Sequence, residues 1–343
     1  MFIIILKGAD KMSARGEIDK KNLSKIKEII KEYPNILLNG YINSMPKQTS
    51  YTKVVYVRYV CNFLNYIKDE LNMNIFDNKI YNNIKPMHID AYMEFIRCTE
   101  DGKEKSGMYR AAQLAAIKKF FKFLKKNEII NNNPCLDVET PKDNSEHKIT
   151  TLSESDISKI MDNIENGVGS HEAVAKQKKW KTRDKAIVLL GITTGLRMSA
   201  IIGIDINDID LKNKTISVVE KGDKRRTVYI GKNTAKALED WLYDRSMIVT
   251  NKKEKAVFIS QKNTRIAPRT MEYIMKRVTY GIRKNITPHK MRATCATRLY
   301  EETGDIYLVQ QQLGHKNIEN TKRYAEVSDK RRKEAANILD SLY

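Results

Sequence analysis

Regular hydrophobic spacing is clearest in the first half of the chain. From Ser50 onward apolar residues recur every three or four positions, at Val54, Val57, Cys61, Leu64 and Ile67. Residues 106–127 repeat the pattern, with an apolar stripe formed by Leu114, Ile117, Phe120, Phe121 and Leu124. This period predicts two amphipathic helices. Residues 13–46 are more polar and rich in lysine, and we expect them to form a helical arm whose role the sequence does not indicate.

A change of pattern marks a domain boundary near the middle of the chain. Three asparagines and Pro134 end the second helix, and residues 140–145 are polar and begin with Thr-Pro. Such residues favour loops over periodic structure. We therefore predict an N-terminal arm over 1–46, a helical domain over 47–134, a linker over 135–150 and a second domain over 151–343.

The second half of the chain mixes strand and helix patterns. Residues 215–219 and 227–230 are rich in β-branched residues and are predicted to pair as a hairpin, with the turn in the charged segment 221–225 between them. Helices are expected at 184–193, 233–249, 268–284, 288–303, 305–313 and 317–324. Thr287 and Pro288 form a helix start, and Gly314 is a helix end. The predicted fold class is mainly α with a small antiparallel sheet.

The charge of the chain points to a polyanionic partner. Lys and Arg total 62 against 42 Asp and Glu, a net charge of +20. Cationic surfaces bind nucleic acid partly by releasing the counterions condensed on its phosphates. On the helix at 106–127 we expect Lys118, Lys119, Lys122 and Lys125 to face DNA; the alternative is an ordinary solvated helix face.

Other protein classes are disfavoured by the sequence. The apolar runs are much shorter than the ~20 residues of a membrane helix, and no signal peptide is recognisable. The four cysteines are scattered singly, as in a reduced, cytoplasmic protein. Asp205, Asp208 and Asp210 are read as turn and capping residues, so we expect neither a metal site nor a cofactor.

Five separated elements carry the candidate chemistry. They are Thr194-Gly195-Leu196-Arg197, the segment Glu220–Arg225 with Lys221, Thr287-Pro288-His289-Lys290-Met291-Arg292, Leu313-Gly314-His315-Lys316, and Tyr324. Their order and spacing resemble those of the tyrosine recombinases of the phage-integrase kind. The likeness is strong over 180–325, whereas 50–145 is similar only as a small helical, SAM-like core-binding domain that precedes a mixed α/β catalytic domain.

The resemblance implies a role for each motif in cutting and rejoining DNA. Tyr324 would attack a DNA phosphate and form a 3′-phosphotyrosyl link. Arg197 and Arg292 would hold the non-bridging oxygens, because planar guanidinium groups stay charged and donate paired hydrogen bonds. His289 would accept the tyrosine proton, and His315 would donate to the phosphate. Lys221 would protonate the leaving 5′-oxygen, with Lys224 as the second choice.

Further contacts to DNA and between subunits follow from the same resemblance. Lys224, Arg225 and Lys290 are expected to touch duplex DNA, and no membrane partner is expected. Four copies would act on two duplexes, with exchange of the amphipathic tail at 329–343, for which packing within one chain is the alternative. The recombination could serve integration, excision, inversion or resolution.

One position departs from the family pattern, and two rival functions share parts of it. The family often has an acidic residue three positions after the first arginine, where this chain has Ala200. A type IB topoisomerase would use the same chemistry, and a non-catalytic DNA-binding protein could retain the scaffold. The Leu-Gly-His motif and the small helical first domain favour a recombinase, and the presence of all the principal motif residues favours an enzyme.

Overall fold

The computed structural model describes residues 14–33, 36–99, 101–141, 149–219, 225–251, 253–282, 286–325, 334, 336–338 and 340–341. The chain divides into two compact units, Met1–Glu146 and His147–Tyr343. Each unit has its own hydrophobic core and is described by itself. Within the described residues, no helix is both long enough and apolar enough to cross a membrane.

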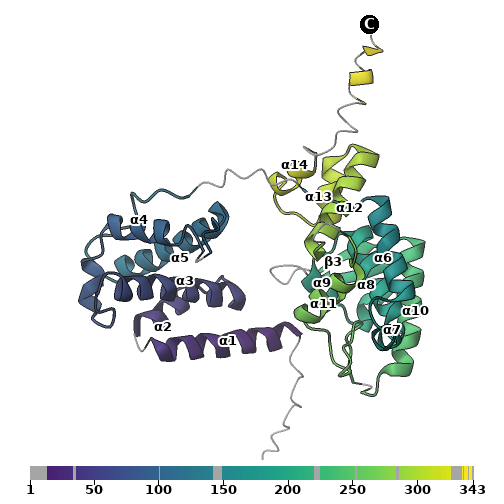
Figure 1. Cartoon of the computed structure of the whole chain (residues 1–343), viewed down its shortest axis with the longest axis horizontal. Coiled ribbons are helices and arrows are strands. Elements are labelled where there is room, and N and C mark those ends of the chain that lie inside the picture. Colours follow the sequence, from purple (N-terminus) through teal and green to yellow (C-terminus); the bar gives the residue numbers. More distant parts are fainter. Residues whose placement is uncertain are drawn as a thin grey trace, which may run out of the picture. The chain divides into compact units, whose positions relative to one another are not determined.

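The N-terminal unit is helical. It contains α1 (Ala14–Glu32), α2 (Ile36–Asn43), α3 (Ser50–Asp69), the short 3-10 helix η1 (Asn78–Asn82), α4 (Pro86–Phe95) and α5 (Gly107–Lys126). Thr49 and Ser106 begin α3 and α5 by accepting hydrogen bonds from the Thr52 and Tyr109 amides. Helix α3 packs against both α1 and α5 (Figure 1), and its predicted apolar stripe is buried there.

The core of this unit includes residues from the segment predicted as an arm. Leu38, Tyr41 and Met45 are almost fully buried. The Tyr41 hydroxyl donates to the Ala116 carbonyl at 3.1 Å, and its ring meets the edge of Phe120 with centroids 5.3 Å apart. Helix α2 is thus packed onto α5.

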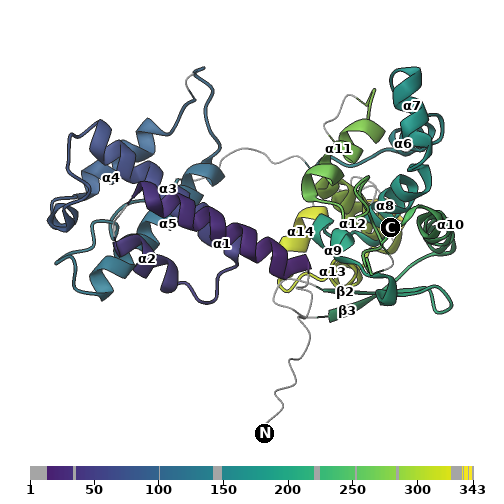
Figure 2. The same ribbon diagram turned by 90° about the horizontal axis from the view of Figure 1, so that it is seen from below.

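Among the described residues, the C-terminal unit contains most of the helices and the only sheet. Its elements are α6 (Glu154–Asn166), α7 (His171–Lys178), α8 (Lys181–Thr194), α9 (Met198–Gly203), η2 (Ile206–Asp208), β1 (Ile209–Asp210), β2 (Thr215–Val219), β3 (Arg225–Tyr229), α10 (Lys232–Ile248), α11 (Pro268–Val278), α12 (Pro288–Thr303), α13 (Ile306–Leu313) and α14 (Glu319–Ala325). Helix α8 is packed between α10 and α12. The strands run antiparallel in the order β1-β2-β3, with Ser217 opposite Thr227. Strands β2 and β3 lie side by side in Figure 2.

Buried charges fix the start of α8. Arg183 donates to the Asp184 carboxylate at 2.8 Å and lies over the ring of Trp180. Arg277 of α11 pairs with the other oxygen of Asp184. Because Asp184 is 1% exposed, its charge depends on these partners. The pair between Arg277 and Asp184 therefore holds α11 against α8, while Arg183 balances the same carboxylate from within α8.

The predicted fold class is confirmed: the chain is mainly α with a small antiparallel sheet. Several element ends differ from the prediction. Helix α11 ends at Val278 rather than 284, and β3 begins at Arg225. Thr287 does precede α12 with Pro288 in the first turn, but its side chain makes no capping hydrogen bond. The aspartates are turn and capping residues as expected: Asp208 accepts from the Asp205 amide, and Asp210 from the Asn213 amide.

Candidate active site

The turn between α8 and α9 presents Arg197. Helix α8 ends at Gly195, which has a left-handed backbone with φ of +63°. A Cβ atom there would lie 2.6 Å from Leu313 Cδ2 and 3.2 Å from Cys295 Sγ, so the turn needs glycine for both conformation and space. Arg197 follows as the N-cap residue of α9 and is exposed.

Arg292 joins three of the predicted motifs. It lies in α12 and is only 2% exposed. One terminal nitrogen of its guanidinium donates to the Gly195 carbonyl, and the other donates to the Leu313 carbonyl at 2.7 Å. The first arginine motif, α12 and the end of α13 are therefore fixed to one another by a single cation.

The His315 loop begins where α13 ends. Gly314 adopts the left-handed conformation expected of a helix C-cap. His315 Nδ1 lies 2.9 Å from the hydroxyl of Thr321, which is fully buried. Burial, together with the nearby Arg292, Arg197, Arg323 and His289, lowers the pKa of His315 to about 4. The ring is therefore neutral at neutral pH and can donate a hydrogen bond from one nitrogen.

His289 lies in the first turn of α12, facing the same cations. Burial lowers its pKa, and Arg323, Arg292 and Arg197 lower it further. A neutral imidazole has a free lone pair on one ring nitrogen. His289 can therefore accept a proton in a cationic pocket that stabilises anions.

Tyr324 lies beneath the His315 loop. It belongs to α14 and is 2% exposed. Its ring packs in a small apolar cluster with Ala293 and Ala296 of α12 and Val309 and Leu313 of α13. The rings of His315 and Tyr324 are nearly parallel, with centroids 6.4 Å apart. In this conformation the predicted nucleophile is shielded from solvent.

Arg323 is a charged residue of this site that the sequence analysis did not single out. Its guanidinium carbon lies 5.4 Å from the centre of the Tyr324 ring, within cation–π distance. It is also among the cations that lower the pKa values of both histidines. Its position directly before the predicted nucleophile was the one available signal, and adjacency alone does not indicate which way a helical side chain points.

The remaining predicted site residues lie on or next to the hairpin and on α12, and only some of them are among the described residues. Lys221 and Lys224 lie outside the described residues. Arg225, at the start of β3, is exposed and pairs with Asp208 at 3.1 Å. Lys290 is half-buried on α12, next to His289. Ala200, at the position where the family often has an acid, packs against the hydrophobic core and supplies no charge to Arg197.

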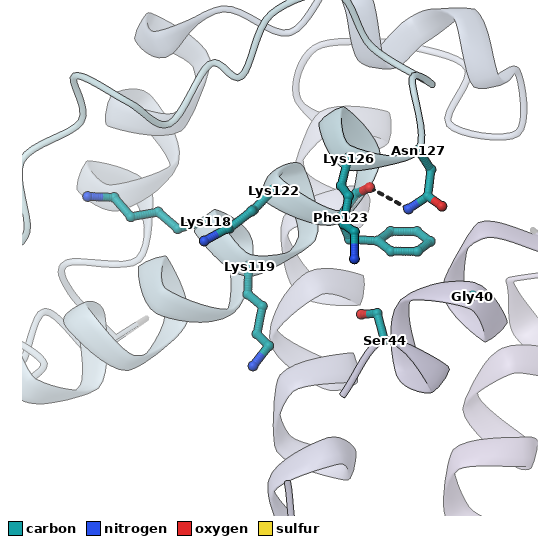
Figure 3. A pocket seen from close by; sticks show the side chains of 8 residues that line it. All are labelled: Gly40, Ser44, Lys118, Lys119, Lys122, Phe123, Lys126 and Asn127. Atoms are coloured by element: carbon teal, nitrogen blue, oxygen red, sulfur yellow. Dashed lines mark hydrogen bonds between the residues drawn. The ribbon is translucent and has the colours of Figure 1, made fainter. Parts of the chain in front are cut away.

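A lysine-lined hollow lies in the N-terminal unit, between α2 and α5 (Figure 3). Its volume is about 740 Å³, and its lining is Gly40, Ser44, Lys118, Lys119, Lys122, Phe123, Lys126 and Asn127. The Phe123 ring points toward Gly40 (Figure 3) and packs so close to it that a Cβ atom at Gly40 would lie 2.9 Å from Phe123 Cζ. Three of the four predicted DNA-facing lysines of α5 line it, together with Lys126 of the same lysine-rich face.

The lysines of this helix are not equivalent. Lys118 donates to the Val138 carbonyl at 2.7 Å, and Lys125 donates to the Asn131 carbonyl at 2.6 Å. These two ammonium groups hold the chain that follows α5. Lys119 lies over the Tyr56 ring, 5.9 Å from its centre. Lys122 and Lys126 are exposed at the hollow.

Comparison with known proteins places this chain among recombinases. The model of the "Phage integrase family" matches residues 150–331. A tyrosine recombinase XerD from Oceanobacillus iheyensis is 30% identical over 284 residues, which cover 81% of this chain and 88% of that protein. A tyrosine recombinase XerC from Caldanaerobacter subterraneus is 29% identical over 340 residues, covering 93% of this chain and 90% of the relative.

Solved structures share the fold at lower identity. The XerH site-specific recombinase bound to a palindromic difH substrate superposes with a TM-score of 0.64 at 22% identity, covering 85% of this chain and 80% of that one. A lambda integrase fragment bound to a core site gives 0.62 at 15% identity, covering 88% and 96%. These matches do not favour the topoisomerase or non-catalytic alternatives. The chain belongs to the phage integrase family, the tyrosine recombinases.

Proposed function

We propose that this chain cleaves and rejoins duplex DNA at a specific site through a 3′-phosphotyrosyl intermediate on Tyr324. The observation that carries the proposal is the convergence of Arg197, His289, Arg292, His315 and Tyr324 from four helices and their loops. Electrostatic coupling links both histidines to both arginines. Tyr324 lies against the His315 ring.

In the proposed reaction the tyrosine oxygen attacks the phosphorus while the bond to the 5′-oxygen breaks. The tyrosine proton passes to neutral His289, and Lys221 protonates the departing 5′-oxygen. Arg197, Arg292 and His315 stabilise the extra negative charge on the phosphorane. Fixed donors aimed at developing charge often contribute more to catalysis than any other single effect. Attack by the free 5′-hydroxyl on the phosphotyrosine reverses the step and reseals a strand.

The burial of Tyr324 adds a condition to this mechanism. A side chain that is 2% exposed among α12 and α13 cannot reach a DNA phosphate without moving. We infer that α14 shifts relative to α12 and α13 when DNA is bound. In the N-terminal unit, the exposed side chains of Lys122 and Lys126 at the basic hollow would contact the DNA backbone.

Assembly and location are part of the same proposal. Four copies on two duplexes, with tails exchanged between subunits, would suit strand exchange. Ile338 of the tail is 61% exposed in its own chain, so an apolar contact on a neighbouring copy would cover it. Both the DNA substrate and the single, unpaired cysteines fit a cytoplasmic protein.

Covalent capture tests the function and finds the DNA site together. The purified chain is incubated with a library of randomised duplexes, denatured in detergent, and the DNA that stays attached to protein is sequenced. The wild-type chain should enrich one site and form an adduct through Tyr324. Tyr324→Phe should bind the enriched duplex normally but form no adduct, since only the nucleophilic oxygen is removed.

Tyr307→Phe is the matched control. Tyr307 is a 66% exposed tyrosine of α13, and its loss should leave adduct formation unchanged. An adduct that persists in Tyr324→Phe would exclude Tyr324 as the nucleophile. The absence of any adduct from the wild-type chain would count against the proposed chemistry as a whole.

A further inference from the structure

Arg226 connects two parts of the catalytic unit that are far apart in sequence. It lies on β3 and is half-buried. One terminal nitrogen of its guanidinium donates to the carbonyls of Gln311 and Gln312, at 3.3 and 3.2 Å. These carbonyls belong to the last turn of α13, 85 and 86 residues further along the chain. The contact therefore joins the hairpin to the helix that leads into the His315 loop.

The end of α13 is a favourable place for a cation. The last carbonyls of a helix have no partner within the helix, and they carry the negative end of its dipole. Arg292 already donates to the next carbonyl, that of Leu313. Two guanidinium groups from different elements thus share one helix end. Gly314 then turns the chain directly into His315, so any shift of this helix end moves that histidine.

The other end of the contact is the part of the hairpin next to its turn. Arg226 is opposite Val218 of β2 in the strand register. Its neighbour Arg225 pairs with Asp208, and adjacent strand residues point to opposite faces. The first two residues of β3 therefore anchor the strand to separate parts of the unit. In sequence, Arg225 is the last residue of the predicted turn, 221–225, which carries Lys221, and Arg226 directly follows it.

We propose that Arg226 is a positioning residue, which fixes the hairpin against α13 and so sets the leaving-group acid at the scissile phosphate; the end of α13 and His315 stay in place without it, because Arg292 also holds that helix end. The inference rests on the proposed function. Arg226 itself does not touch the DNA; it acts through the strand that leads from the hairpin turn. A guanidinium suits this task because its donors are held in a rigid plane, whereas a lysine offers a single flexible point charge.

The leaving group of the DNA distinguishes positioning from a structural role. The experiment uses a nicked duplex with the site enriched by covalent capture, made once with a normal 5′-oxygen and once with sulfur at that bridging position. A 5′-thiolate leaves without being protonated. Arg226→Met should slow adduct formation with oxygen by about 10- to 100-fold, the scale on which a small misplacement of a catalytic group acts. With sulfur its rate should return to within a few-fold of wild type.

Two further variants keep the result interpretable. Arg298→Met removes an arginine of α12 that donates to a single backbone carbonyl, that of Leu152 at 3.4 Å, and should react normally on both duplexes. Arg226→Lys keeps the charge without the rigid fork. It should slow adduct formation less than the methionine variant does, again only on the oxygen duplex. If Arg226→Met fails to fold, the comparison of oxygen with sulfur is made with Arg226→Lys instead.

The outcomes separate this inference from the proposed function. Equal slowing on oxygen and sulfur, or no slowing on either, would overturn the positioning role of Arg226. Lys221→Ala is measured in parallel. If Lys221→Ala is rescued by sulfur and the Arg226 variants are not, the proposed function stands while this inference fails. If the wild-type chain forms no adduct with either duplex, the failure belongs to the proposed function.

Discussion

Arg197 and Arg292 have the same side chain in opposite surroundings, and this predicts different consequences for their loss. Arg197→Ala should reduce cleavage by about 10²–10³-fold, the usual effect of removing one transition-state donor, with little change in melting temperature because the residue is exposed. Arg292→Ala should reduce cleavage and also stability, since it leaves the buried Gly195 and Leu313 carbonyls without this partner.

The two effects are measured by single-turnover cleavage and by thermal unfolding. An unpaired buried carbonyl costs about 1–3 kcal/mol, and each kcal/mol shifts the melting temperature of a unit of this size by roughly 2–4 °C. Arg292→Ala should therefore melt several degrees below Arg197→Ala. Equal melting temperatures would show that the Arg292 contacts contribute nothing to stability.

Arg323 predicts a change in pH dependence. His289 must be neutral to accept a proton, and its pKa is lowered by burial, Arg323, Arg292 and Arg197. Arg323→Met removes one of these cations, so the pKa of His289 should rise. A larger fraction of the molecules then carries a protonated His289 at mildly acidic pH, and these cannot accept the tyrosine proton. The acidic limb of the pH–rate profile for adduct formation should therefore move to higher pH.

Lys322→Met is the control for that measurement. Lys322 is the preceding residue and pairs with Glu319 on the helix surface, and it is not among the groups that lower the pKa of either histidine. Its profile should match the wild type. An acidic limb that stays in place in Arg323→Met would exclude Arg323 from control of the proton acceptor.

At the scale of elements, the turn between α8 and α9 depends on the absence of a side chain at Gly195. Gly195→Ala would place a Cβ atom against Leu313 and Cys295 in a left-handed conformation, which costs a residue with a side chain about 1–2 kcal/mol even without the clash. We expect a melting temperature lower by about 5 °C or more. Cleavage should also fall, because Arg197 is displaced.

Gly203→Ala supplies the comparison for this substitution. Gly203 ends α9, does not have a positive φ, and has open space where a Cβ would lie. Its replacement should leave both the melting temperature and the cleavage rate near those of the wild type. If Gly195→Ala were equally well tolerated, the close approach of the first arginine motif to α13 would not matter for the site.

The sequence predicted the elements that depend on neighbouring residues, and it did not predict features that depend on contacts between segments far apart in the chain. Local signals were sufficient for β2 and for α12, where β-branched residues and Thr287-Pro288 mark the elements. Helix α7 has no buried residue and thus no apolar period to detect. The burial of Tyr324 and the link from Arg226 to α13 depend on contacts between distant segments, which no local pattern encodes. Motif spacing predicted that residues such as Arg197, Arg292 and Tyr324 lie near one another, but it did not predict the burial or the hydrogen-bond partners of each side chain.

At the scale of the whole molecule, the proposed function divides the positive charge between two tasks. The C-terminal unit places its arginines around two neutral histidines, where they can act on one phosphate. The N-terminal unit places exposed lysines around a hollow, where they can contact the DNA backbone without reading its sequence. Mutations in the two units should therefore separate chemistry from binding.

Lys122 and Lys126 test that division. Because each phosphate contact releases about 0.9 counterion, the slope of log affinity against log salt concentration measures the number of contacts. Lys122→Gln and Lys126→Gln should each weaken binding and lower the magnitude of that slope by about 1. The loss should be the same for the captured site and a scrambled duplex, since phosphates are common to both, and the cleavage rate at saturating protein should not change.

Fluorescence anisotropy between 50 and 200 mM salt gives these slopes, a range over which phosphate contacts change affinity strongly. Lys79→Gln is the matched control, because Lys79 is an exposed lysine of η1 in the same unit that does not line the hollow. Lys118→Gln should behave differently again, since its ammonium is bound to the Val138 carbonyl; it should lower stability more than it lowers the salt slope. A wild-type slope in both Lys122→Gln and Lys126→Gln would mean that DNA does not pass over this hollow.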